Sequence, residues 1–259
     1  MDRSYLNYLR FRTLIDYGLT DNEIESYQYG NYASNNYFRK PVYCCEICNK
    51  TYGDIELGNV LHGNILHGTT SDDYFSYLNI NPDSDWVDTT VMFVFENPGK
   101  SQDDDFVDMN GRKMIVTWPY IGWPTKSKAE DFIFETEISS QRRYGSMICA
   151  VLLKYKLRNA YVTNLVKCGF KDNKNLDSKK ISSKIIDNCM NTIFREELKA
   201  ISPDIIFAFG DKSYKTLLNY CDKLCLDSSK VVKMPHPARR MSNENRYKLL
   251  KSTFDSCLL

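Results

Sequence analysis

The chain has 259 residues, of which 42% are hydrophobic and 26% charged, and its formal net charge is +1. This composition is typical of a globular protein and excludes a disordered or fibrous chain. No run of about eighteen apolar residues occurs, so we expect no membrane-spanning segment. The polar start MDRSYLNYLRFRTLIDYG does not resemble a signal peptide, which predicts a cytoplasmic protein.

Charge is divided unevenly along the chain. Asp and Glu exceed Lys and Arg in residues 1–150, whereas the reverse holds in residues 151–259. A basic C-terminal half suits a polyanionic partner such as nucleic acid, although solvated Lys-rich helix faces would give the same composition. The nine cysteines are an odd number in a chain without a secretory signal. They favour a metal or cluster site, or buried thiols, over a disulfide framework.

The N-terminal third contains Tyr- and Asn-rich stretches such as SYQYGNYASNNYF and shows no clear repeat. We interpret residues 1–87 as an extension with one or two helices, in which Gly58–Ile80 is an insertion before the first core strand. Residues 88–259 form the predicted α/β domain, and the two parts are expected to make one compact unit.

Four short apolar runs in the second part do not alternate with polar residues, which is typical of strands buried on both faces of a parallel sheet. They are Val91–Phe95, Tyr161–Val166, Ile205–Phe209 and Val231–Met234. Helical patterns lie between them, at Gln141–Lys156, at Lys179–Ile201 and after Gly210. This alternation predicts a three-layer αβα fold with a central four-stranded parallel sheet.

Polar residues gather where these strands end. The segments concerned are ENPG (96–99), Asn164 to Cys168, GDKS (210–213) and PHPARR (235–240). Ligands of open parallel sheets bind at the carboxyl ends of the strands, so we expect the functional site there.

These segments together resemble the uracil-DNA glycosylase superfamily, and within it the iron–sulfur branch often called family 4. The resemblance covers residues 41–48 and 91–240 and rests on ordered motifs: FENPG, PYIG (119–122), VTNLVKC (162–168), SPDIIFAFGDKSYKTL (202–217) and MPHPAR (234–239). It implies an enzyme that flips a base out of DNA and hydrolyses its glycosidic bond.

The resemblance implies that Asn164 reads the hydrogen-bonding edge of a pyrimidine, and that His236 donates a hydrogen bond to the developing base anion as a neutral imidazole. Tyr120 would stack on the flipped base, although Trp118 and Trp123 lie in the same TWPYIGWP segment and any of the three can belong to the core. Arg239, Arg240 and Met241 would contact phosphates and wedge into the duplex, or they precede a helix that Ser242 caps.

The first motif mixes two branches of the superfamily. Asn97 stands where some branches use Asp or Asn to hold the attacking water, whereas family 4 usually has Ala there. Glu96 matches the family 4 acidic residue, and we expect it to act as the electrostatic partner of Asn97 or to anchor the turn. Gly99 replaces a Tyr of the classical uracil enzymes that excludes C5 substituents, so a bulkier pyrimidine would fit.

Two ligand sets compete for a metal site. The resemblance implies a structural [4Fe–4S] cluster held by four thiolates, the last at the head of a helix; they are Cys45 (or Cys44), Cys48, Cys168 and Cys189. The alternative is zinc, held by these cysteines or by Cys45 and Cys48 with His62 and His67, whose spacing is close to that of a zinc finger.

The sequence therefore predicts a monomeric, monofunctional DNA glycosylase that excises uracil or a modified pyrimidine, with a bulky base such as glucosylated hydroxymethylcytosine included. A lyase step is not indicated, because no lysine stands at a position that the family uses for chemistry. The alternatives are a non-catalytic DNA-binding module with the same fold and a zinc-dependent interaction protein built on the CxxC–HxxxxH segment.

Overall fold

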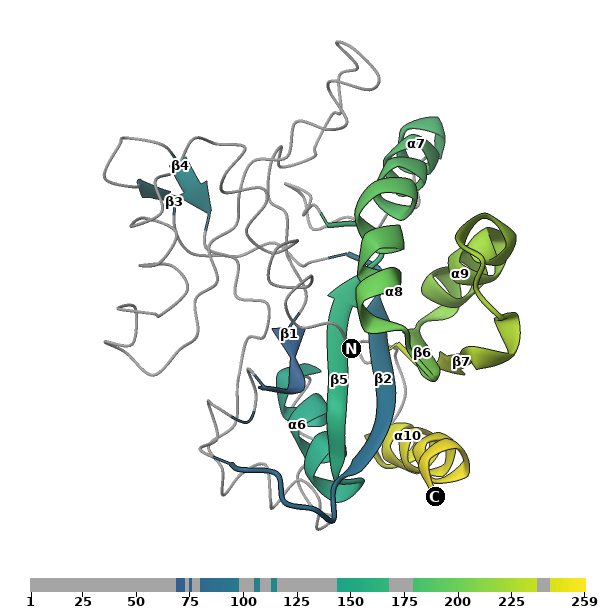
Figure 1. Cartoon of the computed structure of the whole chain (residues 1–259). Helices are drawn as coiled ribbons and strands as arrows, with labels where there is room; N and C mark the ends of the chain where they lie inside the picture. The colour runs from purple at the N-terminus through teal and green to yellow at the C-terminus, as the bar shows by residue number, and fades with distance from the viewer. Residues whose placement is uncertain are drawn as a thin grey trace.

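The computed structural model describes residues 69–72, 75, 80–97, 105–107, 113–115, 144–167, 179–236 and 243–259 (Figure 1). Its strands are β1 (Thr69–Thr70), β2 (Val87–Phe95), β3 (Asp105–Val107), β4 (Lys113–Ile115), β5 (Leu157–Asn164), β6 (Ile205–Phe209) and β7 (Val231–Met234). Its helices are α6 (Tyr144–Lys154), α7 (Lys179–Cys189), η2 (Met190–Phe194), α8 (Arg195–Ile201), α9 (Asp211–Leu224), η3 (Ser228–Lys230) and α10 (Asn243–Leu258).

The central sheet has the strand order β1-β5-β2-β6-β7. The four strands β5, β2, β6 and β7 pair in parallel, which confirms the predicted four-stranded parallel sheet. The short strand β1 adds an antiparallel edge against β5. Strands β3 and β4 form a separate antiparallel pair.

Strand β2 lies in the middle of the sheet and shows why its sequence is apolar without alternation. Successive side chains of a strand point to opposite faces. Val91, Phe93 and Phe95 therefore belong to one apolar cluster, and Met92 and Val94 belong to the other. Because both faces are covered, every residue from Val91 to Phe95 is buried.

Helices cover both faces of the sheet, which confirms the three-layer arrangement (Figure 1). On the face of Phe93, the cluster includes Ile148 and Leu152 of α6 and Phe254 of α10. On the opposite face it includes Phe194 and Leu198, from η2 and α8, and residues of α9 such as Leu217. In the described part of the chain, no helix is both long and apolar enough to cross a bilayer.

Two strands, β2 and β5, begin before their predicted apolar runs; β5 begins at Leu157, four residues before Tyr161. β2 begins at Val87 rather than Val91, because Val87 and Thr90 pair with Leu157 and Asn159 of β5. Thr90 is held further by Asp204, whose carboxylate accepts from Thr90 N at 2.8 Å and whose N–H donates to Thr90 O at 2.9 Å. A polar, partly exposed strand start of this kind lies outside the apolar run. β6 and β7 have the predicted bounds.

Residues just after position 68, which we had assigned to the N-terminal extension, complete the edge of the sheet. Ser71 Oγ donates to Arg158 O at 2.6 Å and accepts from Ala160 N at 3.1 Å, which ties the chain to β5. Phe75 is buried in the same cluster as Phe93 and packs edge-on against Trp86. This short part of the extension therefore belongs to the core.

Candidate functional site

The sheet register brings the strand ends that carry polar residues to one edge. Phe95 pairs with Asn164, and Phe209 pairs with Met234. Because the strands are parallel, Glu96 and Asn97 leave the sheet beside Asn164, and Gly210 leaves it beside the Pro235–His236 segment. Described residues of four predicted motifs thus lie along the same edge.

The turn after β5 is tied to the turn after β2. Leu165 N donates to Phe95 O at 2.8 Å, and Val166 N donates to Glu96 O at 3.0 Å. These bonds end β5 at Asn164, two residues before the predicted end at Val166. Asn164 is only 9% exposed, and Glu96 and Asn97 are partly buried.

Glu96 forms an ion pair across this edge. Its Oε1 lies 3.3 Å from Nζ of Lys212, in the first turn of α9. We had expected Glu96 to act with Asn97 on the attacking water. The ion pair with α9 leaves this expectation a prediction, and it also ties the turn after β2 to the helix that follows β6.

Gly210 provides the space in which the His236 ring lies. A Cβ atom built on Gly210 would lie 3.2 Å from His236 Cδ2 and 3.4 Å from its Cβ. Gly210 also has φ +94°, a conformation that side-chain-bearing residues rarely adopt. Its N–H donates to Met234 O at 2.9 Å, so the backbones of the β6 and β7 ends hold each other in place.

The protonation state of His236 follows from its surroundings. Burial lowers the pKa of His236 below its ordinary value of 6.5, and the Glu96 carboxylate partly opposes this shift. The imidazole is therefore neutral at pH 7. A neutral ring has one N–H with which it can donate a hydrogen bond without giving up a proton.

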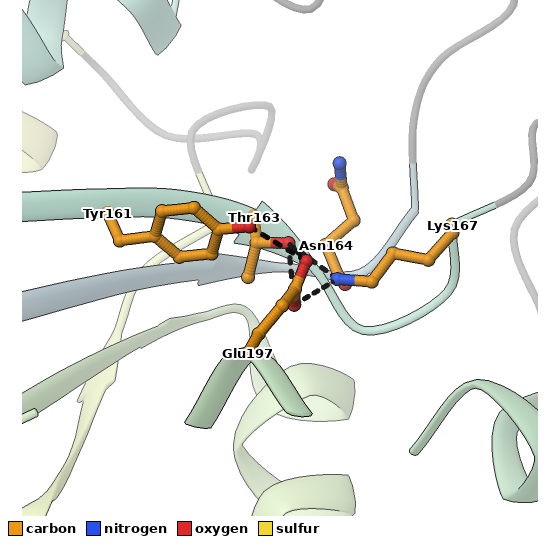
Figure 2. Close-up of polar contacts among 5 residues, drawn as sticks. All are labelled: Tyr161, Thr163, Asn164, Lys167 and Glu197. Atoms are coloured by element: carbon orange, nitrogen blue, oxygen red, sulfur yellow. Dashed lines mark hydrogen bonds and ion pairs between the residues drawn. The ribbon is translucent and has the colours of Figure 1, made fainter. Parts of the chain in front are cut away.

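A second group of polar side chains lies buried beneath Asn164 (Figure 2). Lys167 and Glu197 are 0% and 1% exposed, and Lys167 Nζ lies 2.5 Å from Glu197 Oε2. The ammonium also donates to Thr163 Oγ1 at 2.5 Å and to Asn164 O at 2.6 Å. Removing one partner of a buried ion pair typically costs roughly 3–5 kcal/mol, because the other charge is left without compensation.

Two hydroxyl groups of β5 complete this group. Tyr161 OH donates to Glu197 Oε1 at 2.9 Å, and Thr163 Oγ1 lies 3.2 Å from both carboxylate oxygens. Tyr161 and Thr163 are two residues apart on one strand, so their side chains leave the same face of the sheet. We call Tyr161, Thr163, Lys167 and Glu197 the buried network.

Sequence reasoning placed GDKS (210–213) and Asn164 to Cys168 at the strand ends but assigned no role to Gly210, Lys212 or Lys167. It also missed the buried network that lies beneath Asn164. A signal for Glu197 was present, since it stands three residues after Phe194 and four before Ile201, next to the apolar stripe of the helix. A carboxylate at such a position requires a buried partner. The partner itself could not be identified, because Lys167 lies thirty positions away in the sequence.

Cys189 is the described member of the predicted cluster ligands. It is buried. It closes α7 in the middle of a continuous helical segment, not at the head of a helix as we had expected, and the chain passes into the π-helix η2 directly after it. Among described residues no group of three His, Cys, Asp or Glu residues is placed to hold a metal.

The remaining predicted site residues lie outside the described part of the chain. They are Gly99 and Tyr120 near the base, Arg239, Arg240 and Met241 toward DNA, and Cys45, Cys48, Cys168, His62 and His67 as metal ligands.

Fold and site together define a class: a three-layer α/β protein whose polar residues gather at the carboxyl ends of its parallel strands. Within this class, the model of the Uracil DNA glycosylase superfamily matches residues 83–256. This match covers more than half of the chain, and the chain therefore belongs to that superfamily, whose members are DNA glycosylases. No curated protein was found to match the chain.

Proposed function

We propose that this protein is a monofunctional DNA glycosylase that flips uracil or a modified pyrimidine out of DNA and hydrolyses its N-glycosidic bond. The observation that carries the proposal is the sheet register, which aligns the Asn164 strand end with the turn of Glu96 and Asn97, together with a neutral His236 at the same edge. An amide, a neutral imidazole and a water-holding group are what such a reaction requires.

Each residue has a role in this proposal. The Asn164 amide donates to and accepts from the pyrimidine edge, and His236 stabilises the negative charge that develops on the departing base. Asn97 orients the attacking water toward the sugar. Glu96, held by Lys212 at 3.3 Å, contributes negative charge that favours the positively charged sugar of the transition state.

The substrate is a pyrimidine, and its C5 substituent is the open variable of the proposal. The FENPG motif resembles family 4 at Glu96 and other branches at Asn97, and Gly99 stands at the motif position where the classical uracil enzymes carry a Tyr that excludes C5 substituents. We therefore include 5-hydroxymethylcytosine and its glucosylated form as substrates. Excision of uracil would serve base-excision repair, whereas excision of a hypermodified base would serve defence against phage DNA.

Oligonucleotide duplexes that each carry one such base test the proposal. After incubation with the protein, hot alkali cleaves the strand wherever a base has been removed, and gel electrophoresis counts the breaks. We expect breaks at the modified position with the wild-type protein and about 10²- to 10³-fold slower cleavage with His236→Ala. Binding without breaks on every substrate would favour the non-catalytic DNA-binding module.

We further propose that Cys45, Cys48, Cys168 and Cys189 hold a structural [4Fe–4S] cluster that clamps the N-terminal segment onto the domain. The support for this ligand set is the resemblance of the four cysteine positions to those of family 4, and the buried position of Cys189 is compatible with it. The purified protein should be brown and show the visible absorbance band of a four-thiolate iron–sulfur cluster. Zinc in metal analysis that survives Cys168→Ser and Cys189→Ser would instead favour the site with His62 and His67.

A further inference from the structure

We infer that the Lys167–Glu197 ion pair, within the buried network, positions Asn164 and fixes the direction of the base-reading amide. The inference rests on the role proposed above for Asn164. Neither the VTNLVKC motif nor the match to the superfamily gives the Lys167–Glu197 ion pair this role.

The contacts of Lys167 exclude a direct chemical role. Its ammonium group has three donor hydrogens, and three acceptors lie within 2.6 Å: Thr163 Oγ1, Asn164 O and Glu197 Oε2. The side chain has no exposed surface. A lysine whose hydrogens are all engaged in this way neither attacks a sugar nor binds a phosphate.

The same contacts clamp the end of β5. Two of the three acceptors belong to Thr163 and Asn164, the last two residues of the strand. On the other side, the next two residues, Leu165 and Val166, are bonded to the backbone at the end of β2. The backbone that carries the Asn164 amide is thus held from two directions.

Figure 2 shows what this clamp leaves for the amide. The backbone oxygen of Asn164 faces Lys167, whereas its side-chain amide extends away from the other four residues. Hydrogen bonds weaken steeply as their angle departs from linearity, so a small rotation of this backbone would misalign the amide with a base edge. A displacement of about 1 Å at a reacting site can cost roughly 10²-fold in rate.

Glu197 makes the clamp possible. A buried ammonium needs a compensating charge, and Glu197 supplies it from α8, which packs across the sheet face opposite α6. Tyr161 also contacts this carboxylate, but on its other oxygen, Oε1, and from three residues before Asn164. The Tyr161 contact therefore supports the network without touching the backbone of Asn164, which makes it a matched control.

The test compares three variants of the full chain. Lys167→Met/Glu197→Met removes both charges and the clamp, and similar apolar volume should preserve the fold. Tyr161→Phe removes one hydrogen bond of the same network and keeps the clamp. Asn164→Ala removes the amide itself. Thermal melting reports stability. Single-turnover kinetics on a uracil duplex, measured over a range of protein concentrations, report the rate constant of base release and the affinity for DNA separately.

We expect the double variant to release uracil at least about tenfold more slowly than wild type, with unchanged affinity for undamaged duplex. Tyr161→Phe should stay within about twofold of wild type in rate, even where it melts at a lower temperature. In the Asn164→Ala background, the double substitution should cost no further activity, because its effect passes through the amide. A folded double variant with wild-type kinetics, or additive losses with Asn164→Ala, would overturn the inference.

Nuclear magnetic resonance separates this inference from the proposed function. The side-chain NH₂ signals of Asn164, assigned by their loss in Asn164→Ala, should be shifted or broadened in the double variant and unchanged in Tyr161→Phe. If the wild-type protein releases no base, the proposed function fails, yet these signals still decide whether the ion pair positions the amide. If the Asn164 NH₂ signals were identical in wild type, the double variant and Tyr161→Phe, the ion pair would not position the amide.

Discussion

Lys212 sets how strongly the Glu96 charge acts on His236. Glu96 pairs with Lys212 at 3.3 Å, and its carboxylate raises the pKa of His236 against the larger effect of burial. In Lys212→Met the carboxylate loses its cation and attracts the imidazole proton more strongly. We expect a higher pKa of His236 in this variant, measured from the imidazole signals across a pH titration.

Lys215→Met is the control, because it removes an exposed lysine from the next turn of the same helix. It should leave the pKa of His236 unchanged. An equal pKa in wild type and Lys212→Met would show that the ion pair does not control the ring.

The same pKa shift has a consequence for stability. Because the folded-state pKa of His236 lies below 6.5, the unfolded chain binds this proton more tightly than the folded protein does. The contribution of His236 to the free energy of unfolding is thus complete above pH 6.5 and is lost as the pH falls through the folded-state pKa. In Lys212→Met this acid-induced loss should be smaller, and denaturant titrations at several pH values measure it.

Gly210 is the residue where a single methyl group should disturb the site. Gly210→Ala places a side chain at φ +94° and a Cβ atom 3.2 Å from the His236 ring. A backbone conformation of this kind costs about 1–3 kcal/mol for a residue other than glycine. We expect a lower free energy of unfolding and a lower rate of base release, measured by urea titration and single-turnover kinetics.

Ser213→Ala is the control for Gly210→Ala, because Ser213 lies in the first turn of α9, the helix that Gly210 precedes. It removes a buried hydroxyl that has no hydrogen-bond partner in the described part of the chain, so stability should not fall. If Gly210→Ala were as stable and active as Ser213→Ala, the close packing of Gly210 on His236 would contribute neither to stability nor to the rate of base release.

At the scale of elements, α9 ends in a conformation that its sequence does not favour. Cys225, its C-terminal cap, has φ 52° and is exposed. Left-handed backbone costs roughly 1–2 kcal/mol for most residues and nothing for glycine. Replacement by glycine removes this cost, but part of the gain is lost because the unfolded chain is more flexible at a glycine. Cys225→Gly should therefore stabilise the protein by about 0.5–1 kcal/mol.

Thermal melting checks this expectation, and Lys215→Gly in the exposed interior of the same helix should instead destabilise by up to about 1 kcal/mol. A lower melting temperature for Cys225→Gly would mean that its side chain makes a contact that outweighs the strain.

Elements with a strong apolar signal could be predicted from the sequence, and those that depend on distant partners could not. β6 is apolar throughout, and in β7 (VVKM) Lys233 is the one polar residue, so the bounds of both strands were predicted correctly. β1 has two threonines, and it forms a strand only because β5 offers it an edge. The start of β2 likewise pairs with β5 and is held further by Asp204, which is 114 positions away from Thr90.

The candidate site divides in the same way. Glu96, Asn164 and His236 stand in short motifs at strand ends, which the sequence indicates directly, and the roles we expect for them stay predictions. The pairing of Glu96 with Lys212 and of Lys167 with Glu197 arises from helices that cross the sheet ends, and no local pattern specifies which charges meet.

At the scale of the whole molecule, the superfamily match and the parallel sheet span the same part of the chain, residues 83–256 and β2 to α10. The basic excess of residues 151–259 falls within this part. Phosphate contacts by such charges would bind DNA of any sequence and weaken as salt increases. Recognition of the base would then come from other residues, among them those at the strand ends.

Mass spectrometry of the base released from DNA tests this account most directly. Duplexes carrying uracil, 5-hydroxymethylcytosine or glucosylated 5-hydroxymethylcytosine would be incubated with wild-type protein and with Asn164→Ala. The account predicts one free pyrimidine and a matching abasic site with wild type, and a loss of about tenfold or more in its rate of release with Asn164→Ala. Wild-type protein that binds every duplex and releases no base, or equal release by Asn164→Ala, would contradict it.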